Sequence, residues 1–280
     1  MKGLVNRIIH TSVVDGPGNR AAIFLQGCNY TCCYCHNPET INRCVHCGAC
    51  VKICPTGALV MDQGKVVWQA EKCCNCDQCL GACPNLASAK VTAYTAAEVM
   101  DLLKKDIPFI RGITVSGGEC SLQRDFLLEL FTLAKEKKLS TLMDSNGSYD
   151  YTADAELMAV CDGVMLDVKA WDDEDHRKLA GASSRPVIEN AIKLAEAGKL
   201  EEIRTVVVPG FLDNEKTVNE ITKLLAPYLE KGQIRYKIIA YRPFGVRKPF
   251  CKEFRVPTTD ELEHLAQIAR NNGFTNIVLI

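Results

Sequence analysis

Apolar residues recur along this chain in short runs that end in polar or glycine-rich turns. Runs of this length, bounded by turn signals, are typical of buried β-strands. The clearest predicted strands are residues 21–28 (AAIFLQGC), 112–118 (GITVSGG), 140–146 (STLMDSN), 163–169 (GVMLDVK), 202–210 (EIRTVVVPG) and 234–243 (IRYKIIAYRP).

Amphipathic stretches with helical spacing lie between these runs. In one of them Leu127, Leu130, Phe131 and Ala134 recur on one helical face, which predicts burial against a sheet. The predicted helices are residues 95–106, 124–138, 185–198 and 215–232. Six strands alternating with helices favour parallel βαβ units, and therefore an α/β fold with a partial (β/α)6, TIM-like barrel.

Residues 42–90 interrupt the alternation. We therefore predict two domains: a barrel made of residues 1–41 and 91–280, and an insert made of residues 42–90.

Charge and hydropathy exclude several classes of protein. The 280 residues carry a formal net charge of −1, so no strong field favours nucleic acid or an anionic membrane. No apolar run approaches the roughly 20 residues that span a bilayer, and the N-terminus lacks the features of a signal peptide. We expect a cytoplasmic protein with neither nucleic acid nor membrane as a partner.

The sixteen cysteines of the chain indicate what kind of chemistry it carries out. Disulfides are rare in a reducing cytosol, which favours metal binding or redox chemistry. Two runs read C-x2-C-x2-C-x3-C-P, and the second repeats the first 29 positions later. This is the pattern of bacterial ferredoxins with two 4Fe–4S clusters, in which the fourth cysteine of each run ligates the other cluster. The predicted ligand sets are Cys44, Cys47, Cys50 and Cys83 for one cluster, and Cys73, Cys76, Cys79 and Cys54 for the other.

Zinc is the alternative for these runs, because structural zinc sites also favour C-x2-C pairs. A zinc site does not explain why each run has three closely spaced cysteines and a fourth that would serve the other site. Among the remaining cysteines, Cys161 and Cys251 are expected to be small buried hydrophobes. His46 and His176 carry no signal beyond that of solvated polar residues.

A third cysteine motif has only three spaced ligands. Cys28, Cys32 and Cys35 read C-x3-C-x2-C, and Cys33 is surplus. A 4Fe–4S cluster held by three cysteines keeps one iron open, and an open position at a metal is where a substrate or cofactor binds. The motif follows the first predicted barrel strand, and other polar motifs end the next three strands. Barrel enzymes carry their active sites at the rim formed by the carboxyl ends of the strands.

These motifs resemble those of the radical S-adenosylmethionine (SAM) superfamily, in which an aromatic residue, here Tyr34, precedes the last cluster cysteine. The segments DGPGNR (15–20) and CHNP (35–38) are similar to those of glycyl-radical-enzyme activating enzymes, such as pyruvate formate-lyase activase. A ferredoxin insert that follows the three-cysteine loop of residues 28–38 (the cluster loop) resembles the longer branch of these activases, to which the YjjW type belongs. The resemblance implies a radical SAM barrel with an inserted 2×4Fe–4S ferredoxin-like domain.

The resemblance also implies roles for single residues. SGGE, with Gly117, Gly118 and Glu119, would bind the methionyl amino group of SAM, although Cys120 replaces the usual proline. Lys169 would meet the methionyl carboxylate. The expected SAM-facing residues are completed by Tyr34, Asp144, Ser145, Asp167 and Arg204. A monovalent cation would lie beside SAM, near Asp144 and Asp167. The histidine that often follows PF in the family, where it contacts the ribose, is absent from YRPFGVR (241–247).

The implied activity is reductive cleavage of SAM at a 4Fe–4S cluster to methionine and a 5′-deoxyadenosyl radical. That radical would abstract hydrogen from a glycine Cα of a partner enzyme. Three 4Fe–4S clusters and SAM are the expected cofactors, and reduced flavodoxin or ferredoxin is the expected electron donor. Two alternatives stay open: a radical SAM enzyme acting on a small molecule, and a ferredoxin-type electron carrier.

Overall fold

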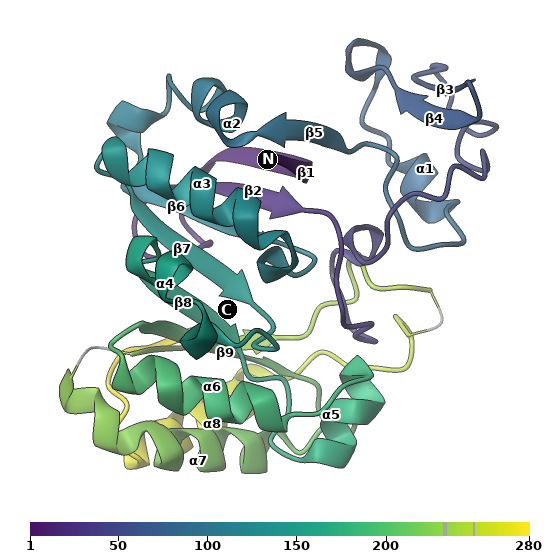
Figure 1. Cartoon of the computed structure of the whole chain (residues 1–280). Coiled ribbons are helices and arrows are strands. Elements are labelled where there is room, and N and C mark those ends of the chain that lie inside the picture. Colours follow the sequence, from purple (N-terminus) through teal and green to yellow (C-terminus); the bar gives the residue numbers. More distant parts are fainter. Residues whose placement is uncertain (232–233, 249) are drawn as a thin grey trace.

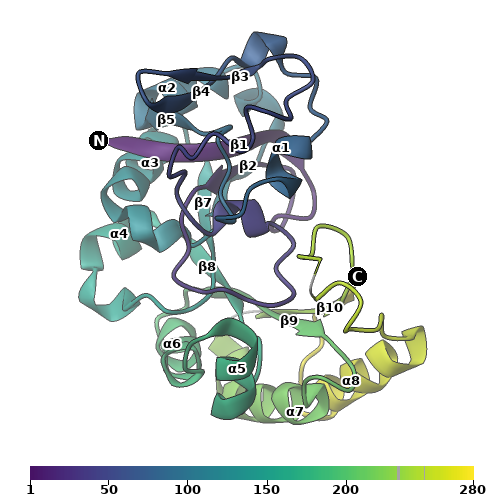
Figure 2. The same cartoon turned by 90° about the vertical axis from the view of Figure 1, so that its right-hand side faces the viewer.

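The computed structural model describes residues 1–231, 234–248 and 250–280. Its centre is one nine-stranded sheet with the order β11-β10-β9-β8-β7-β6-β2-β1-β5. The strands are β1 (Lys2–Ser12), β2 (Arg20–Leu25), β5 (Thr92–Thr95), β6 (Gly112–Gly117), β7 (Ser140–Ser145), β8 (Gly163–Asp167), β9 (Leu200–Val207), β10 (Arg235–Ala240) and β11 (Ile277–Leu279). The sheet is curved and open, with helices on its outer face (Figure 1, Figure 2).

The six predicted strands are confirmed as neighbouring parallel strands, from β2 to β10. In β2 every residue is buried, as expected for a strand covered on both faces. Three strands of the sheet were not predicted. β1 pairs antiparallel with β2, β5 pairs antiparallel with β1, and β11 extends the other edge.

The helices are α1 (Gln78–Gly81), α2 (Ala96–Leu102), α3 (Arg124–Glu136), α4 (Ala155–Val160), α5 (Asp173–Ala180), α6 (Arg185–Glu196), α7 (Asn214–Leu225) and α8 (Thr259–Asn271). The apolar face predicted for α3 is buried. The helix predicted over 215–232 is shorter, because Pro227 cannot donate a backbone hydrogen bond and the chain continues as a 3-10 helix (Ala226–Lys231). Its predicted end, Gly232, lies outside the described residues. No helix in the described part of the chain is long and apolar enough to cross a membrane.

The concave face of the sheet carries charged side chains below the rim. Arg20 is buried and donates from Nε to Thr114 Oγ1 (2.7 Å). Glu202 is buried and pairs with Arg204, Arg235 and Lys237. Lys237 also donates to the carbonyl oxygen of Val14, at 3.0 Å, and so attaches the β1–β2 loop to the sheet.

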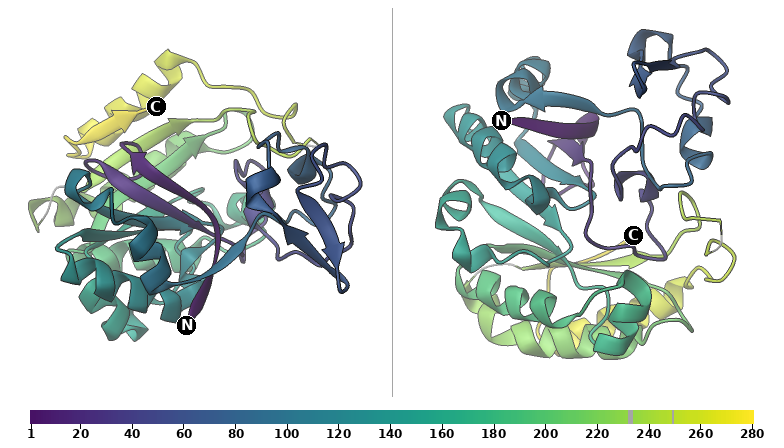
Figure 3. Two further views of the ribbon diagram at one scale, coloured as in Figure 1. Left: turned by 90° about the horizontal axis from the view of Figure 1, so that it is seen from above. Right: turned by 45° about the vertical axis from the view of Figure 1, so that its right-hand side comes forward.

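Residues between the cluster loop and β5 extend beside the carboxyl ends of the strands (Figure 3). They contain a two-stranded hairpin, β3 (Leu59–Asp62) and β4 (Lys65–Trp68), and have a small apolar cluster of their own around Cys50, Leu59 and Val66. A bridge between Asn42 and Ala87 holds the two ends of the segment together, and Gln26 Nε2 attaches it to the barrel by donating to the Asn42 carbonyl oxygen, at 2.5 Å.

Candidate functional site

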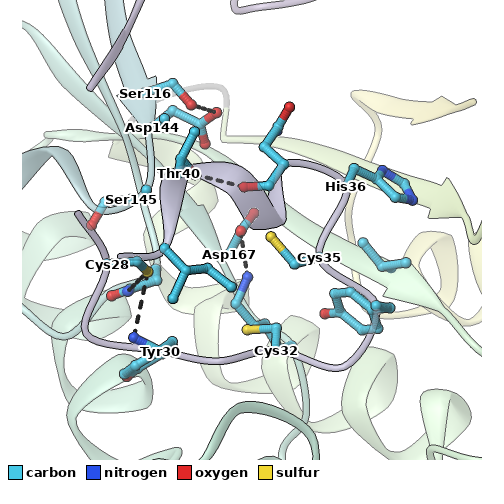
Figure 4. A pocket seen from close by; sticks show the side chains of 18 of the residues that line it. Cys28, Tyr30, Cys32, Cys35, His36, Thr40, Ser116, Asp144, Ser145 and Asp167 are labelled. Atoms are coloured by element: carbon cyan, nitrogen blue, oxygen red, sulfur yellow. Dashed lines mark hydrogen bonds and ion pairs between the residues drawn. The ribbon is translucent and has the colours of Figure 1, made fainter. Parts of the chain in front are cut away.

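A cavity of about 240 Å³ opens at the carboxyl ends of the barrel strands (Figure 4). One wall is the loop after β2, and the other is made by the ends of β6 to β10. Most of the predicted site residues line it: Cys28, Cys32, Tyr34, Cys35, Gly117, Gly118, Asp144, Ser145, Asp167, Lys169 and Arg204. The fold therefore brings together motifs that lie up to 176 residues apart in sequence, from Cys28 to Arg204.

Backbone hydrogen bonds fix the loop that carries the three cysteines. Cys28 N donates to Ile41 O (2.8 Å), while the amides of Thr31 and Cys33 donate to the last carbonyls of α5, those of Ala180 and Leu179. Arg247 Nη2 donates to the carbonyls of Thr31 (2.8 Å) and Cys32 (3.1 Å). Because the loop is held from three sides, its thiols are positioned without depending on one another.

Burial keeps these thiols protonated in the absence of a metal. It raises the pKa of Cys28 to about 11 and that of Cys35 to about 12, and it also raises the pKa of Cys32. A coordinated thiol is deprotonated by the positive charge of the metal, so an iron–sulfur cluster, which soft thiolates favour, would convert these groups into ligands. Among the described residues no set of three or more His, Cys, Asp or Glu side chains is arranged around a single ion. The three thiols of this loop fit a 4Fe–4S cluster, which takes cysteine thiolates as ligands.

Two glycines form the opposite wall because no side chain fits there. A Cβ on Gly117, whose φ is +117°, would lie 2.2 Å from Leu25 N, and a Cβ on Gly118 would lie 2.1 Å from Gly27 O. Glycine therefore lets β6 pack against the end of β2 and leaves its own backbone open to the cavity.

Two ion pairs lie across the floor of the cavity. Lys169 Nζ is 2.6 Å from Asp167 Oδ2, and Arg204 Nη1 is 2.8 Å from Asp144 Oδ2. Burial raises the pKa of Asp144 to about 6, although Arg204 opposes the shift. Burial lowers the pKa of Lys169, but Asp167, Tyr34 and Cys32 outweigh it, so the net pKa is well above the ordinary value. The floor offers cationic groups for a carboxylate and carboxylates for an amine or a cation.

Glu119 is placed differently from the other predicted residues. It is fully buried and does not line the cavity. Its Oε1 accepts hydrogen bonds from Ser121 N, Ser121 Oγ and Ser145 Oγ, and its Oε2 accepts one from Asn146 N at 2.8 Å. In this arrangement Glu119 joins the loop after β6 to the loop after β7.

Sequence reasoning missed several residues of the cavity wall, including His36, Asn37, Thr40, Ile41 and Asn146. His36 Nε2 donates to Arg242 O (3.0 Å), and burial lowers its pKa. The position after PF is Gly245, where a Cβ would lie 2.4 Å from His36 O. A histidine at that position would not fit this backbone. The CHNP segment was the signal that pointed to His36.

The predictions for Cys251 and His176 need correction. Cys161 is buried as predicted, but Cys251 is half-buried, because its loop lies over the cluster loop. The prediction of a solvated His176 is wrong. Its ring lies edge-on to Tyr30, with centroids 5.7 Å apart, and is fully buried where α5 packs against the cluster loop.

The insert contains two smaller cavities lined by cysteines. One is lined by Cys44, Cys47, Cys50, Cys79 and Cys83, and the other by Cys54, Cys73, Cys74, Cys76 and Cys79. Each cavity thus contains the first three cysteines of one run and the last cysteine of the other, together with one further cysteine: Cys79 in the first cavity and Cys74 in the second. Cys47 and Cys76 are exposed, so both cavities open toward solvent.

The chain is similar to known proteins over most of its length. The chain matches the Radical SAM superfamily over residues 22–225. It is 32% identical over 268 residues to the isethionate sulfite-lyase activating enzyme of Nitratidesulfovibrio vulgaris, covering 88% of this chain and 86% of that protein. It is 31% identical over 288 residues to the pyruvate formate-lyase-activating enzyme of Streptococcus mutans, covering 97% and 92%. QueE from Escherichia coli shares the fold, with a TM-score of 0.57, 13% identity and coverage of 100% of this chain and 94% of that one.

The curved parallel sheet and its cysteine-lined rim thus define an enzyme of the radical SAM superfamily, to which the chain belongs. Its curated relatives place it among the glycyl-radical enzyme activating enzymes of that superfamily. Membership implies a 4Fe–4S cluster and SAM as cofactors.

Proposed function

We propose that this protein activates a partner glycyl-radical enzyme by cleaving SAM at a 4Fe–4S cluster held by Cys28, Cys32 and Cys35. One electron supplied to the cluster breaks the C5′–S bond of SAM. The products are methionine and a 5′-deoxyadenosyl radical, which takes a hydrogen atom from a glycine Cα of the partner. 5′-Deoxyadenosine and a glycyl radical remain, so atoms and electrons balance.

The observation that carries this proposal is the composition of the cavity. Three thiols from one loop face two glycines and two ion pairs from the ends of four other strands. A cluster with three protein ligands keeps one iron for another ligand. The amino and carboxylate groups of a methionyl moiety match the charges of the floor.

The side chains of the protein would position the substrate and exclude water. Lys169 is the cation for the methionyl carboxylate. Asp144 and Asp167 are the acceptors for a monovalent cation beside SAM, with Arg204 holding Asp144 in place. Tyr34, which is buried in the cluster loop, lines the cavity and provides an apolar surface. Bound SAM then reacts in a site where water does not quench the radical.

The insert is proposed to hold two further 4Fe–4S clusters at its two cysteine cavities. Ferredoxin-type clusters have low reduction potentials, which suits a relay of electrons from reduced flavodoxin or ferredoxin to the cluster at the barrel rim. The exposed cysteines of the insert support this role, because a donor protein must come close to the first cluster of a relay.

Anaerobic reconstitution tests the proposal. The full chain with iron, sulfide, dithionite and SAM should release 5′-deoxyadenosine, and addition of the partner should give the doublet of a glycyl radical in electron paramagnetic resonance (EPR). Cys32→Ala should abolish both signals, whereas Cys33→Ala, next to it in the same loop, should retain them. Undiminished 5′-deoxyadenosine from Cys32→Ala would refute the assignment of the cluster.

A further inference from the structure

Asn146 is the first residue after β7, and its side chain faces the cluster loop. It is 6% exposed and lines the cavity. Its Nδ2 is 3.8 Å from Cys28 Sγ and 2.9 Å from Asn29 Oδ1. The side chain therefore contacts one of the three thiols proposed to hold the cluster.

Hydrogen bonds fix which end of this amide faces the sulfur. Asn146 Oδ1 accepts from Ser148 N (3.0 Å), so this oxygen cannot be exchanged with Nδ2 without placing two donors together. The orientation of Asn29 follows, because the atom that faces the donor Asn146 Nδ2 at 2.9 Å must be an acceptor, and Asn29 Nδ2 then donates to Ser148 Oγ at 2.8 Å. Asn29 Oδ1 is then the acceptor, and Asn146 presents its N–H groups to Asn29 and Cys28.

The backbone behind Asn146 is held just as firmly. Its amide N donates to Glu119 Oε2, and Ser145 Oγ donates to Glu119 Oε1 at 3.0 Å. Tyr151 Oη donates to Ser145 Oγ at 2.7 Å. A fully buried carboxylate thus anchors the loop from which the Asn146 amide reaches Cys28.

We propose that Asn146 sets the reduction potential of the cluster at Cys28, Cys32 and Cys35 through its N–H···S hydrogen bond, with Glu119 as the residue that positions it. Hydrogen bonds to cluster sulfurs stabilise the more electron-rich reduced state and so raise the potential. Cys28 Sγ also accepts from Tyr30 N (3.4 Å), so the side-chain bond adds to a backbone bond. The inference rests on the proposed function, because it needs a cluster at these thiols.

The test is an EPR-monitored potentiometric titration of the reconstituted full chain, with dithionite as the reductant. SAM identifies the relevant signal, because it perturbs the cluster with an open iron and not those with four thiolates. Asn146→Leu removes the donor at similar volume, and Asn146→Asp removes it while keeping the acceptor for Ser148 N. In both variants the SAM-responsive signal should titrate at a lower potential than in the wild type.

Asn190→Asp is the matched control. Asn190 is 4% exposed, and its Nδ2 donates to the carbonyls of Gly147 (2.9 Å) and Tyr149 (2.6 Å). Asn190 supports the same loop without contacting sulfur. The SAM-responsive signal of Asn190→Asp should therefore titrate at the wild-type potential. An unchanged potential in Asn146→Leu would overturn the proposal, as would an equal shift in Asn190→Asp. If Asn146→Leu fails to take up the cluster, Asn146→Asp is judged by the same criterion.

No partner enzyme takes part in the titration. Failure to form a glycyl radical would therefore contradict the proposed function and leave the potential shift intact. A wild-type chain without any SAM-responsive signal would contradict both.

Discussion

Gly118 illustrates how single residues shape the cavity. Its backbone lies against Gly27 and against the carbonyl of Thr40, so three chain segments meet where one hydrogen atom replaces a side chain. The same contacts place the end of β6 beside the cluster loop. The cavity wall therefore depends on the smallness of one residue as much as on its charged groups.

Gly118→Ala should weaken SAM cleavage on the order of 100-fold, since a Cβ 2.1 Å from Gly27 O forces the two segments apart and shifts of about 1 Å cost that much in rate. The rate of 5′-deoxyadenosine release measures the effect. Gly81→Ala is the control, because a Cβ there meets nothing within 4 Å. Equal rates for the two variants would show that close packing at Gly118 is unimportant.

At the scale of elements, packing of the helices on the outer face holds the sheet in its curve. Phe126, Leu127, Leu130, Phe131 and Ala134 of α3 are buried in the main core, while Arg124 at its start pairs with Asp154 before α4. Both kinds of contact lie away from the cavity. They are expected to affect stability without direct effects on chemistry.

Leu130→Ala should lower the free energy of unfolding by about 2–5 kcal/mol, because it leaves a cavity in a close-packed core. Urea unfolding followed by far-ultraviolet circular dichroism measures the change. Leu122→Ala, at a position that is 51% exposed, should change the free energy by less than about 0.5 kcal/mol. A small effect at Leu130 would contradict the packing of α3.

Asp154→Asn should lower the melting temperature near neutral pH and have less effect in acid. Hydrogen bonds from Arg124, at 2.6 and 2.7 Å, hold the pKa of Asp154 below its ordinary value of about 3.9. Because the folded-state pKa is depressed, this stabilisation is present above about pH 4 and is lost as the pH falls further. The gap between the melting temperatures of the two proteins should narrow from pH 7 to pH 3, and a constant gap would argue against the ion pair.

At the scale of the whole molecule, the insert lies beside the rim of the barrel (Figure 3). Gln26 Nε2 donates to the carbonyls of both Glu39 and Asn42, which bracket the junction between the two parts. The cysteine cavity that contains Cys44 begins two residues beyond Asn42. This placement suits the proposed passage of electrons from the insert to the rim.

Cys76→Ser should remove one cluster from the insert and slow SAM cleavage driven by reduced flavodoxin or ferredoxin. Cleavage driven by dithionite should change much less, since a small reductant reaches the rim cluster without the relay. The ratio of the two rates, with iron content as the check on cluster loss, measures the effect. Cys74→Ser is the control, because Cys74 is also exposed and lines the same cavity but stands outside the spaced ligand pattern. Equal slowing with both reductants would favour a structural role for the insert.

The central strands and the residue types of the site follow from the sequence. Apolar runs such as 21–28 can be recognised as central strands, because a strand buried on both faces has to be apolar throughout. The site motifs follow such runs directly, so their meeting at one rim followed from the parallel arrangement alone.

The edges of the sheet and the directions of the polar side chains depend on contacts between distant segments. β1, β5 and β11 are half polar or very short, so pairing with neighbours and not their own pattern makes them strands. The Glu119 carboxylate accepts hydrogen bonds from Ser121, Ser145 and Asn146 and does not face the cavity. The side-chain amide of Asn146 points to Cys28. Motif spacing cannot show these directions, because each depends on hydrogen-bond partners that the fold brings from distant segments.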